Sequence, residues 1–390
     1  MFTRELTGTV ETCLQTFPAI GILGPRQVGK TTLVKTLLTN FKKEVVYLDL
    51  EYFADQRRLQ EPDLFFQANQ DKLIVLDEIQ RMPELFPLLR SMIDQHRVPG
   101  RFILLGSASP DLLRNSSESL AGRIIYLELS PLHLLEVQPR YDYRQHWLKG
   151  GFPDALLSPD QTIWQYWMES FIQTYVQRDL PALGMPAQPA LIRRLLTMLV
   201  SLHGGQLNYS QLARSLDLSV PTVQQYIGFL EDAYLIRRLS PYFVNIGKRL
   251  IKAPKVFVRD SGMVHALADL TDYNALTGSA LLGASWEGYV VQQIVSRLPM
   301  PVTPYYYRTQ NGAELDLLLV KAGKPVVSIE IRYSNDPSLK RGNTQAIDDI
   351  QTTNNLIVTP EADGYWLRKD VKVCSINTVW NELTQLGILP

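Results

Sequence analysis

The sequence predicts an α/β fold in which a parallel sheet with helices on both faces comes first and smaller helical and mixed units follow. Short apolar runs alternate with helical patterns through the first third of the chain, which is typical of βα units. A glycine-rich loop joins the first apolar run to a helix. The chain has 390 residues, more than a single core usually supports, so we expect about two to three domains.

Composition narrows the class of protein. Hydrophobic residues make up 45% and charged residues 20%, and no apolar run approaches the roughly 18 residues of a membrane span. Arg4 and Glu5 stand where a signal peptide would be apolar, and Cys13 and Cys374 lack metal-type spacing, so we expect a cytoplasmic protein without membrane contact. The formal net charge is zero, so any nucleic-acid contact requires local patches of charge.

The most specific motif is the loop that follows the strand 19–23. It fits the phosphate-binding-loop pattern, and a helix follows it, as that pattern requires. Lys30 is expected near the β- and γ-phosphates of a nucleoside triphosphate, and the Thr31 hydroxyl is a ligand for Mg²⁺. The expected contacts to ATP come from consecutive residues: Gly24, Pro25, Arg26, Gln27, Val28, Gly29, Lys30, Thr31 and Thr32.

A second buried strand, 73–76, ends in two acids. Because ligands of open α/β sheets bind at the carboxyl ends of strands, Asp77 and Glu78 are expected beside the phosphates. Asp77 would support Mg²⁺ together with Thr31, and Glu78 would orient and activate the attacking water. The alternative is that these acids only cap the next helix.

Three more strands are expected at 45–49, 102–105 and 124–127. Ser107 follows the second of them, where it would sense the γ-phosphate. Arg123 directly precedes the third, where a ring ATPase places the arginine that reaches a neighbouring subunit's γ-phosphate. Arg123 as a plain surface arginine is the alternative.

These motifs, with Leu120–Arg123 and Gly150–Pro153, resemble one group of prokaryotic AAA+ ATPases. Members carry a C-terminal domain of unknown function, and the likeness covers nearly the whole chain. The resemblance implies ATP hydrolysis with Mg²⁺. An arginine supplied by a neighbouring subunit implies a homo-oligomer, and the resemblance suggests a ring of six.

A helix-turn-helix pattern follows a helical lid. One helix is expected at 209–216, a second begins at Pro221, and 235–239 reads as the first strand of a wing. Three outward residues of the second helix are of types that reach base edges: Thr222, Gln224 and Gln225. Basic residues without an intervening acid suggest contacts to DNA phosphates: Arg237, Arg238, Lys248, Arg249, Lys252, Lys255 and Arg259. Winged helices also dock proteins, which is the alternative.

The C-terminal part predicts a hairpin that carries acids. If the hairpin is centred on Gly323, Asp316 lies opposite Glu330, and Glu314 lies opposite Arg332, all on one face. Bound Mg²⁺ would relieve the repulsion between Asp316 and Glu330.

A helix before the hairpin offers Glu287 as a third ligand. This arrangement resembles the core of PD-(D/E)xK nucleases, except that Arg332 replaces the family's lysine. Arginine is effectively never deprotonated, so a degenerate core held by salt bridges is the alternative to a cleaving site.

The predicted domains are the ATPase domain 1–138, the lid 139–189, the winged helix-turn-helix 190–260 and the nuclease-like domain 261–390. The predicted function is ATP hydrolysis by an oligomeric ATPase, coupled to binding and remodelling of DNA or translocation on it. The alternatives are an ATP-dependent nuclease and a nucleotide-gated switch whose C-terminal domains bind proteins.

Overall fold

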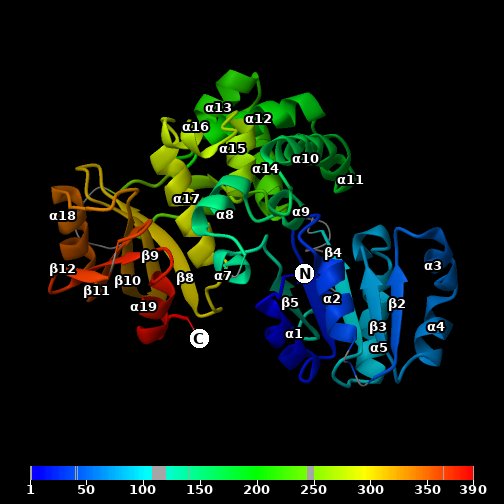
Figure 1. Cartoon of the computed structure of the whole chain (residues 1–390). Coiled ribbons are helices and arrows are strands. Elements are labelled where there is room, and N and C mark those ends of the chain that lie inside the picture. Colours follow the sequence, from blue (N-terminus) through cyan, green and yellow to red (C-terminus); the bar gives the residue numbers. More distant parts are fainter. Residues whose placement is uncertain are drawn as a thin grey trace.

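The protein consists of two sheets joined by a helical middle segment (Figure 1). The computed structural model describes residues 2–39, 41, 43–107, 120–138, 140–243, 250–362 and 364–389. The first sheet lies at one end of the molecule and the second at the other, and the middle helices bridge them. Within the described residues, no helix has both the length and the apolar character needed to cross a membrane.

The first sheet is parallel, in the order β2-β3-β4-β1-β5. Its strands are β1 (Ala19–Leu23), β2 (Val45–Asp49), β3 (Leu73–Asp77), β4 (Phe102–Gly106) and β5 (Ile124–Glu128). Its helices are α1 (Leu6–Leu14), α2 (Lys30–Leu38), α3 (Phe53–Arg58), α4 (Pro62–Ala68) and α5 (Leu85–Gln95), with a 3₁₀ turn η1 (Ile79–Arg81). Alternate residues of β1 enter two separate cores, Ile20 and Ile22 in one and Ala19 and Leu23 in the other. The predicted sheet with helices on both faces is therefore confirmed.

The middle segment is almost entirely helical. Its helices are α7 (Leu134–Val137), α8 (Tyr143–Lys149), α9 (Pro153–Leu156), α10 (Gln161–Thr174), α11 (Leu180–Ala182), α12 (Pro189–Ser201), α13 (Tyr209–Leu216), α14 (Val220–Asp232), α15 (Ser261–Leu267) and α16 (Tyr273–Thr277). A π-helical turn, η2 (Tyr175–Asp179), interrupts α10 and α11. The Ser219 side chain accepts a hydrogen bond from the backbone N–H of Thr222 and so caps α14. After α14, β6 (Ile236–Leu239) and β7 (Lys255–Val258) pair antiparallel.

The second sheet is mixed, in the order β12-β13-β11-β10-β9-β8. Its strands are β8 (Val302–Arg308), β9 (Glu314–Lys321), β10 (Lys324–Ile331), β11 (Asn354–Thr359), β12 (Tyr365–Arg368) and β13 (Val371–Ser375), and its helices are α17 (Leu282–Val295), α18 (Arg341–Ile350) and α19 (Val379–Gln385). Lys321 pairs with Lys324 across the hairpin turn, and a β-bulge then shifts the register so that Ile329 pairs with Leu317. The pairing predicted from a turn centred on Gly323 is therefore correct from Val327 onward, beyond the bulge, and wrong for the pairs next to the turn.

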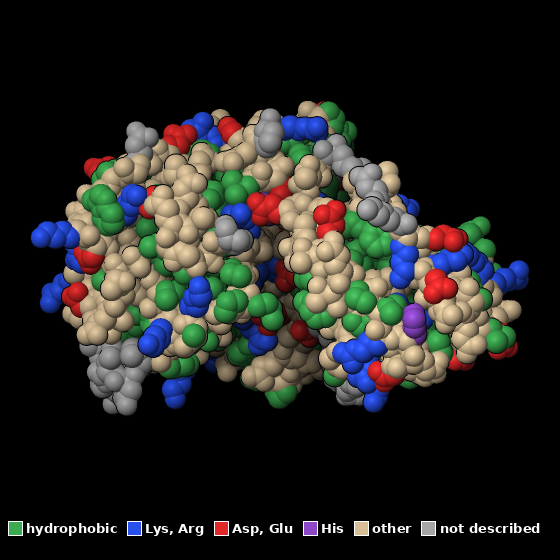
Figure 2. All heavy atoms as spheres, turned by 90° about the horizontal axis from the view of Figure 1, so that it is seen from below, with side chains coloured by type: hydrophobic (Ala, Val, Ile, Leu, Met, Phe, Trp, Pro, Cys, Tyr) green, Lys and Arg blue, Asp and Glu red, His purple; other side chains and the backbone are tan. Residues whose placement is uncertain are grey.

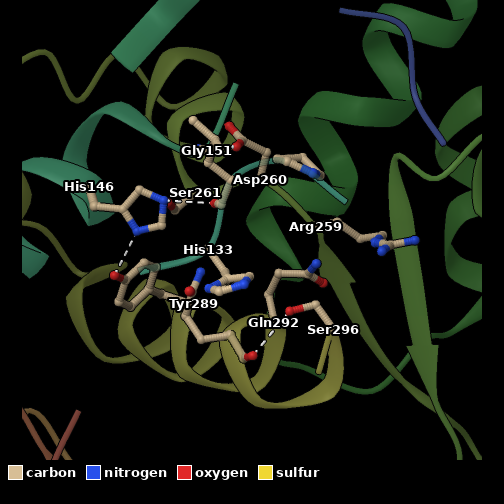
Figure 3. A pocket seen from close by; sticks show the side chains of 12 residues that line it. His133, His146, Gly151, Arg259, Asp260, Ser261, Tyr289, Gln292 and Ser296 are labelled. Carbon is tan, nitrogen blue, oxygen red and sulfur yellow. Dashed lines mark hydrogen bonds between the residues drawn. The ribbon is translucent and has the colours of Figure 1, made fainter. Parts of the chain in front are cut away.

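A small polar cavity of about 20 Å³ lies where the segment after β5, helix α8 and helix α17 meet. Figure 3 shows His146 between the Tyr289 hydroxyl and the Leu132 carbonyl, each 2.9 Å from a ring nitrogen. Burial lowers the pKa of His146 to about 4, so its ring is neutral at pH 7 and needs both partners. The Asp260 carboxylate accepts a 2.8 Å hydrogen bond from the Gly151 N–H. The Gly150–Pro153 motif of the sequence thus lies next to Asp260, the N-cap residue of α15.

Candidate functional site

The phosphate loop runs from β1 into α2 in the conformation that its glycines require. Gly29 has φ 92° and caps α2, which begins at Lys30. A Cβ at Gly24 would lie 2.2 Å from the carbonyl oxygen of Leu129, the residue that follows β5. The Lys30 ammonium is buried and donates to the carbonyls of Gly24, at 3.0 Å, and Pro25, at 2.9 Å. Burial lowers the pKa of Lys30 to about 8.

Thr31 and Asp77 lie together, as the sequence predicts for a shared metal ion. The Thr31 hydroxyl donates to Asp77 Oδ2 at 2.7 Å. The Tyr47 hydroxyl, from β2, donates to the same oxygen. Burial and this hydrogen bond raise the pKa of Tyr47, so the phenol stays a donor. Hydroxyl and carboxylate oxygens suit Mg²⁺, so the residues present fit the ion. Tyr47 belongs to no recognisable sequence motif, and the pairing of β2 with β3 places it beside Asp77.

Glu78 has a strained backbone at the end of β3. Its φ of 56° is left-handed, which is uncommon for a residue with a side chain and often marks functional sites. Burial raises the pKa of Glu78, and Lys30 and a hydrogen bond from Gln80 oppose the rise. Glu78 lines a cavity of about 300 Å³ with eight further residues in or close to the loop: Arg26, Gln27, Gly29, Lys30, Thr31, Thr174, Arg178 and Asp179.

Ser107 lies at the end of β4, beside a second cavity of about 220 Å³. This cavity shares Arg26 and Asp179 with the first, and its other lining residues include Glu51, Gln80 and Arg81. Within the described residues, the buried Ser107 hydroxyl has no hydrogen-bond partner. A free buried hydroxyl at the carboxyl edge of the sheet suits a contact to a phosphate oxygen.

The helical middle segment contacts the phosphate loop through Arg26 of the loop. Arg26 forms ion pairs with Asp179, in the π-helical turn, and with Glu51, at 2.8 Å. Arg81 reaches the same Glu51 carboxylate at 2.9 Å. π-Helical turns are rare and frequently occur at functional sites. The sequence marks Arg26 only as a loop residue, and nothing in it points to Asp179 as its partner.

An apolar pocket of about 370 Å³ lies against the loop and α2. Its lining includes Phe2, Thr32, Leu33, Leu132, Pro153 and Leu157. Thr32, expected among the phosphate contacts, thus lines this pocket instead of the polar cavities. Gly29 borders both this pocket and the 300 Å³ cavity.

Arg123 lies at the edge of the sheet away from the phosphate loop. It precedes Ile124, which pairs with Ala19 at the start of β1, whereas the loop follows the end of β1. Two guanidinium nitrogens donate to the Asp94 carboxylate at 2.6 and 2.8 Å. Within the described residues, Arg123 is thus engaged with Asp94 at the opposite end of the sheet from the loop, and its role in a neighbouring subunit stays a prediction.

Several of the basic residues expected to contact DNA phosphates have partners inside the chain, and their contact with DNA stays a prediction. Arg238 Nε donates to Glu231 at 2.6 Å, Arg237 donates to Gln292 at 3.3 Å, and Arg259 pairs with Glu128. Lys248 and Arg249 lie outside the described residues. On the face in Figure 2, Lys and Arg side chains of the coloured residues are interspersed with Asp and Glu.

The three residues of α14 expected to reach base edges, Thr222, Gln224 and Gln225, differ in their surroundings. The Thr222 hydroxyl lies 2.7 Å from the Ser219 hydroxyl at the helix cap. Gln224 and Gln225 are exposed. The face of α14 therefore leaves two amide side chains free to meet a partner.

The buried position of Lys255 contradicts the expectation that this residue contacts DNA phosphates. Its ammonium is buried among three carboxylates, 2.8 Å from Glu287, 3.1 Å from Glu314 and 3.2 Å from Asp316. Burial opposes the charge, but these carboxylates raise the pKa of Lys255 well above its ordinary value. Burial also raises the pKa of Glu287, to about 7. Lysine thus supplies the cation that the sequence expected Mg²⁺ to supply.

The remaining acid of this face pairs with Arg332. Continuing the register of β9 and β10 by one position sets Glu330 opposite Asp316, as the sequence predicts. Arg332 pairs with Glu330, however, and Glu314 pairs with Lys255 and Arg308. The expected Glu314–Arg332 pair is therefore wrong. Within the described residues, no group of three or more His, Cys, Asp or Glu side chains is arranged to hold a metal ion.

Comparison with known proteins identifies three consecutive segments. An AAA domain matches residues 16–138, a domain of unknown function (DUF8612) matches 140–274, and a second domain of unknown function (DUF4143) matches 282–379. Uncharacterized protein Rv2008c of Mycobacterium tuberculosis is 40% identical over 358 residues, which cover 92% of this chain and 80% of that protein. Uncharacterized protein Mb2031c of Mycobacterium bovis matches equally well.

Two solved structures are more distant. The Walker-type ATPase PABY2304 of Pyrococcus abyssi is 17% identical with a TM-score of 0.45, over 69% of this chain and 96% of that one. AMPPCP-bound DnaA from Aquifex aeolicus is 14% identical with a TM-score of 0.32, over 60% and 90%. Both are too distant to inform the biological role. The chain belongs to the same family as Rv2008c and Mb2031c, and it is an AAA-type P-loop ATPase.

Proposed function

We propose that MgATP binds at the loop and that its hydrolysis switches the contacts between the ATPase domain and the rest of the chain. The observation that carries the proposal is the 2.7 Å contact of Thr31 with Asp77, beside Lys30 and Glu78 at one cavity. Loop N–H groups hold the phosphates, and Thr31 and Asp77 hold Mg²⁺. Bound Mg²⁺ supplies positive charge that stabilises the phosphate oxygens. Glu78 accepts the proton of the attacking water.

The apolar pocket is the place for the nucleoside base. Its apolar lining suits a planar aromatic ring, and it meets the phosphate cavity at Gly29. Phe2, Leu132 and Pro153 come from three segments far apart in the sequence. A base held here would tie the N-terminal segment and the lid to the loop.

Arg26 is the first element of the switch. In the structure it pairs with Asp179 of the lid and borders the phosphate cavity. A terminal phosphate is an anion that competes with Asp179 for this guanidinium. Binding of ATP would therefore weaken the tie between Arg26 and the π-helical turn, and loss of the terminal phosphate would restore it.

A second line of contacts leads from the loop to the C-terminal domain. Arg4 donates to the Val28 carbonyl of the loop at 2.8 Å and to Glu136 at 3.0 Å. The next residue, Glu5, accepts from Arg297 at 2.9 Å. Arg297 lies 4.8 Å from the ring of Trp380 in α19. A loop that shifts on binding nucleotide would thus act on both sheets.

Hydrogen exchange tests this switch. We expect the ATP-bound Glu78→Gln protein and the ADP-bound protein to differ in exchange at η2 and at the end of α17. Lys30→Ala, which removes the phosphate-binding ammonium, is the control and should show no nucleotide-dependent difference. Equal exchange in the two nucleotide states, with both nucleotides bound, would refute the switch while leaving ATP binding intact.

A second candidate function is remodelling of DNA or translocation on it by an oligomer. The exposed Gln224 and Gln225 on α14 favour it, because amide side chains suit base edges. ATP turnover measured with and without single-stranded, duplex and branched DNA decides it. Stimulation that is lost in Gln224→Ala/Gln225→Ala supports DNA as the partner. Turnover that ignores all three DNAs, with no binding at low salt, removes it.

A further inference from the structure

Two buried polar atoms beside the phosphate cavity have no partner within the described residues. They are the side-chain carbonyl oxygen of Gln80 and the hydroxyl of Ser107. Both residues line the same 220 Å³ cavity. A buried polar atom without a hydrogen bond is destabilising, so such atoms call for a ligand or a water. Ser107 already has an expected role, and Gln80 has none.

The position of Gln80 is fixed by the turn that carries it. It is the middle residue of η1, which directly follows Glu78. The Arg81 N–H donates to the Glu78 carbonyl at 2.9 Å, and the Arg81 side chain pairs with Glu51. Ile79 is buried in the core. The residues before and after Gln80 are therefore both fixed, Ile79 by burial and Arg81 by its contacts.

The two ends of the Gln80 amide have different surroundings. Its NH₂ group donates to Glu78 Oε2, and its oxygen is the unpartnered atom. The opposite orientation would set the amide oxygen against the carboxylate, which is repulsive. Glu78 thus fixes which end of the amide is left for the cavity.

We propose that Gln80 is a further catalytic residue, whose carbonyl oxygen binds the attacking water while its NH₂ group holds Glu78. This inference rests on the proposed ATP hydrolysis. The water oxygen forms a bond to the γ-phosphorus, and the bond from that phosphorus to the β,γ-bridging oxygen breaks. One water proton passes to the Glu78 carboxylate, and ADP leaves with the electron pair of the broken bond. A single amide then orients both the nucleophile and its base.

Gln80→Met tests the proposal, because methionine keeps the length of the side chain and removes both polar ends. Gln67→Met makes the same change at an exposed position of α4 and is the matched control. Steady-state turnover and the affinity for a fluorescent ATP analogue are measured for each protein. We expect kcat to fall ~10²-fold in Gln80→Met, with affinity within about threefold of the parent.

The pH profile reports on the hydrogen bond between Gln80 and Glu78. Glu78 faces Lys30, Asp77 and Arg26, which both variants retain, and the hydrogen bond from Gln80 lowers the pKa of Glu78. The acidic limb of kcat should therefore move to higher pH in Gln80→Met and further in Gln80→Glu, which adds a second carboxylate.

The outcomes separate this inference from the proposed function. If the parent and Gln67→Met neither bind nor hydrolyse ATP, the proposed function fails. If they do, and Gln80→Met keeps kcat within twofold with an unmoved acidic limb, the role of Gln80 is refuted. Gln80→Glu keeps an oxygen acceptor at similar volume. If Gln80→Met does not fold, the pH profile of kcat in Gln80→Glu tests the role of Gln80. In that case, an unchanged profile in Gln80→Glu also refutes the role.

Discussion

Lys255 of β7 donates to Glu287 of α17 across 2.8 Å, and both side chains are withdrawn from water. The same ammonium reaches Glu314 and Asp316 on β9. The pair therefore ties the two-stranded hairpin after α14 to the C-terminal sheet, with one cation among three carboxylates. The ammonium thus offsets part of the negative charge that the three carboxylates bring together.

Removal of this cation should destabilise the protein strongly. In Lys255→Met, Glu287 and Asp316 stay in place without their neutralising charge, and loss of one partner from a buried ion pair costs about 3–5 kcal/mol. Urea denaturation at pH 8 measures the loss. Lys252→Met, at an exposed position, should change the free energy of unfolding by less than about 0.5 kcal/mol. Equal stability of the two variants would contradict the assignment of Lys255.

The destabilisation by Lys255→Met should depend on pH. Burial raises the folded-state pKa of Glu287 to about 7 from the ordinary 4.5. Protonation of this group therefore favours the folded state; its contribution is complete below pH 4.5 and is lost as the pH rises through about 7. Without Lys255 the carboxyl holds its proton to still higher pH. The loss of stability should thus be largest above pH 7 and shrink toward pH 4.5. A loss that is constant between pH 5 and 8 would contradict this account.

The contrast between Lys30 and Lys255 shows how far the sequence could go. Lys30 belongs to a contiguous motif with a strand before it and a helix after it, so its place could be predicted from neighbours alone. Lys255 lies in a basic stretch, which predicts an outward charged surface. Its true partners are 32, 59 and 61 residues away, as the numbers of Glu287, Glu314 and Asp316 show.

Tyr47 and Gln80 illustrate the same limit at the active site. The sequence predicts the strands that carry or precede them, and it predicts that Asp77 and Glu78 lie at the carboxyl edge. Which side chain then donates to which carboxylate depends on the pairing of β2 with β3 and on the turn after β3. In the C-terminal hairpin, the β-bulge between Pro325 and Val327 restores the predicted register at Glu330, although Lys324 and Pro325 pair in a register shifted by one residue.

Gly24→Ala should disrupt the phosphate loop. The added Cβ would lie 2.2 Å from the backbone oxygen of Leu129, and the Leu129 N–H donates to the Leu23 carbonyl, so this segment cannot move alone. We expect a loss of about 1–3 kcal/mol of stability and at least tenfold weaker ATP binding, measured by urea denaturation and by titration with nucleotide. Gly228→Ala in α14 meets no atom within 4 Å and should be neutral or stabilising. Intact ATP affinity in Gly24→Ala would contradict the geometry of the loop.

A mixing experiment tests whether Arg123 acts in a neighbouring subunit. Arg123→Ala keeps Glu78, and Glu78→Gln keeps Arg123, so each protein alone should turn over ATP slowly. If Arg123 leaves Asp94 to reach the next subunit, mixed oligomers contain sites with both residues, and turnover should recover. The gain from such an arginine is typically ~10³–10⁵-fold. No recovery from mixing, or full activity of Arg123→Ala alone, would contradict the role.

The central claim is that Glu78 activates water against a triphosphate held by the loop and Lys30. The most direct measurement is phosphate release by the parent protein and by Glu78→Gln, together with the affinity of each for ATP. The account predicts that both bind ATP with similar affinity and that Glu78→Gln releases phosphate at least ~10²-fold more slowly. Equal rates of phosphate release from the two proteins, or a parent protein that binds no ATP, would contradict it.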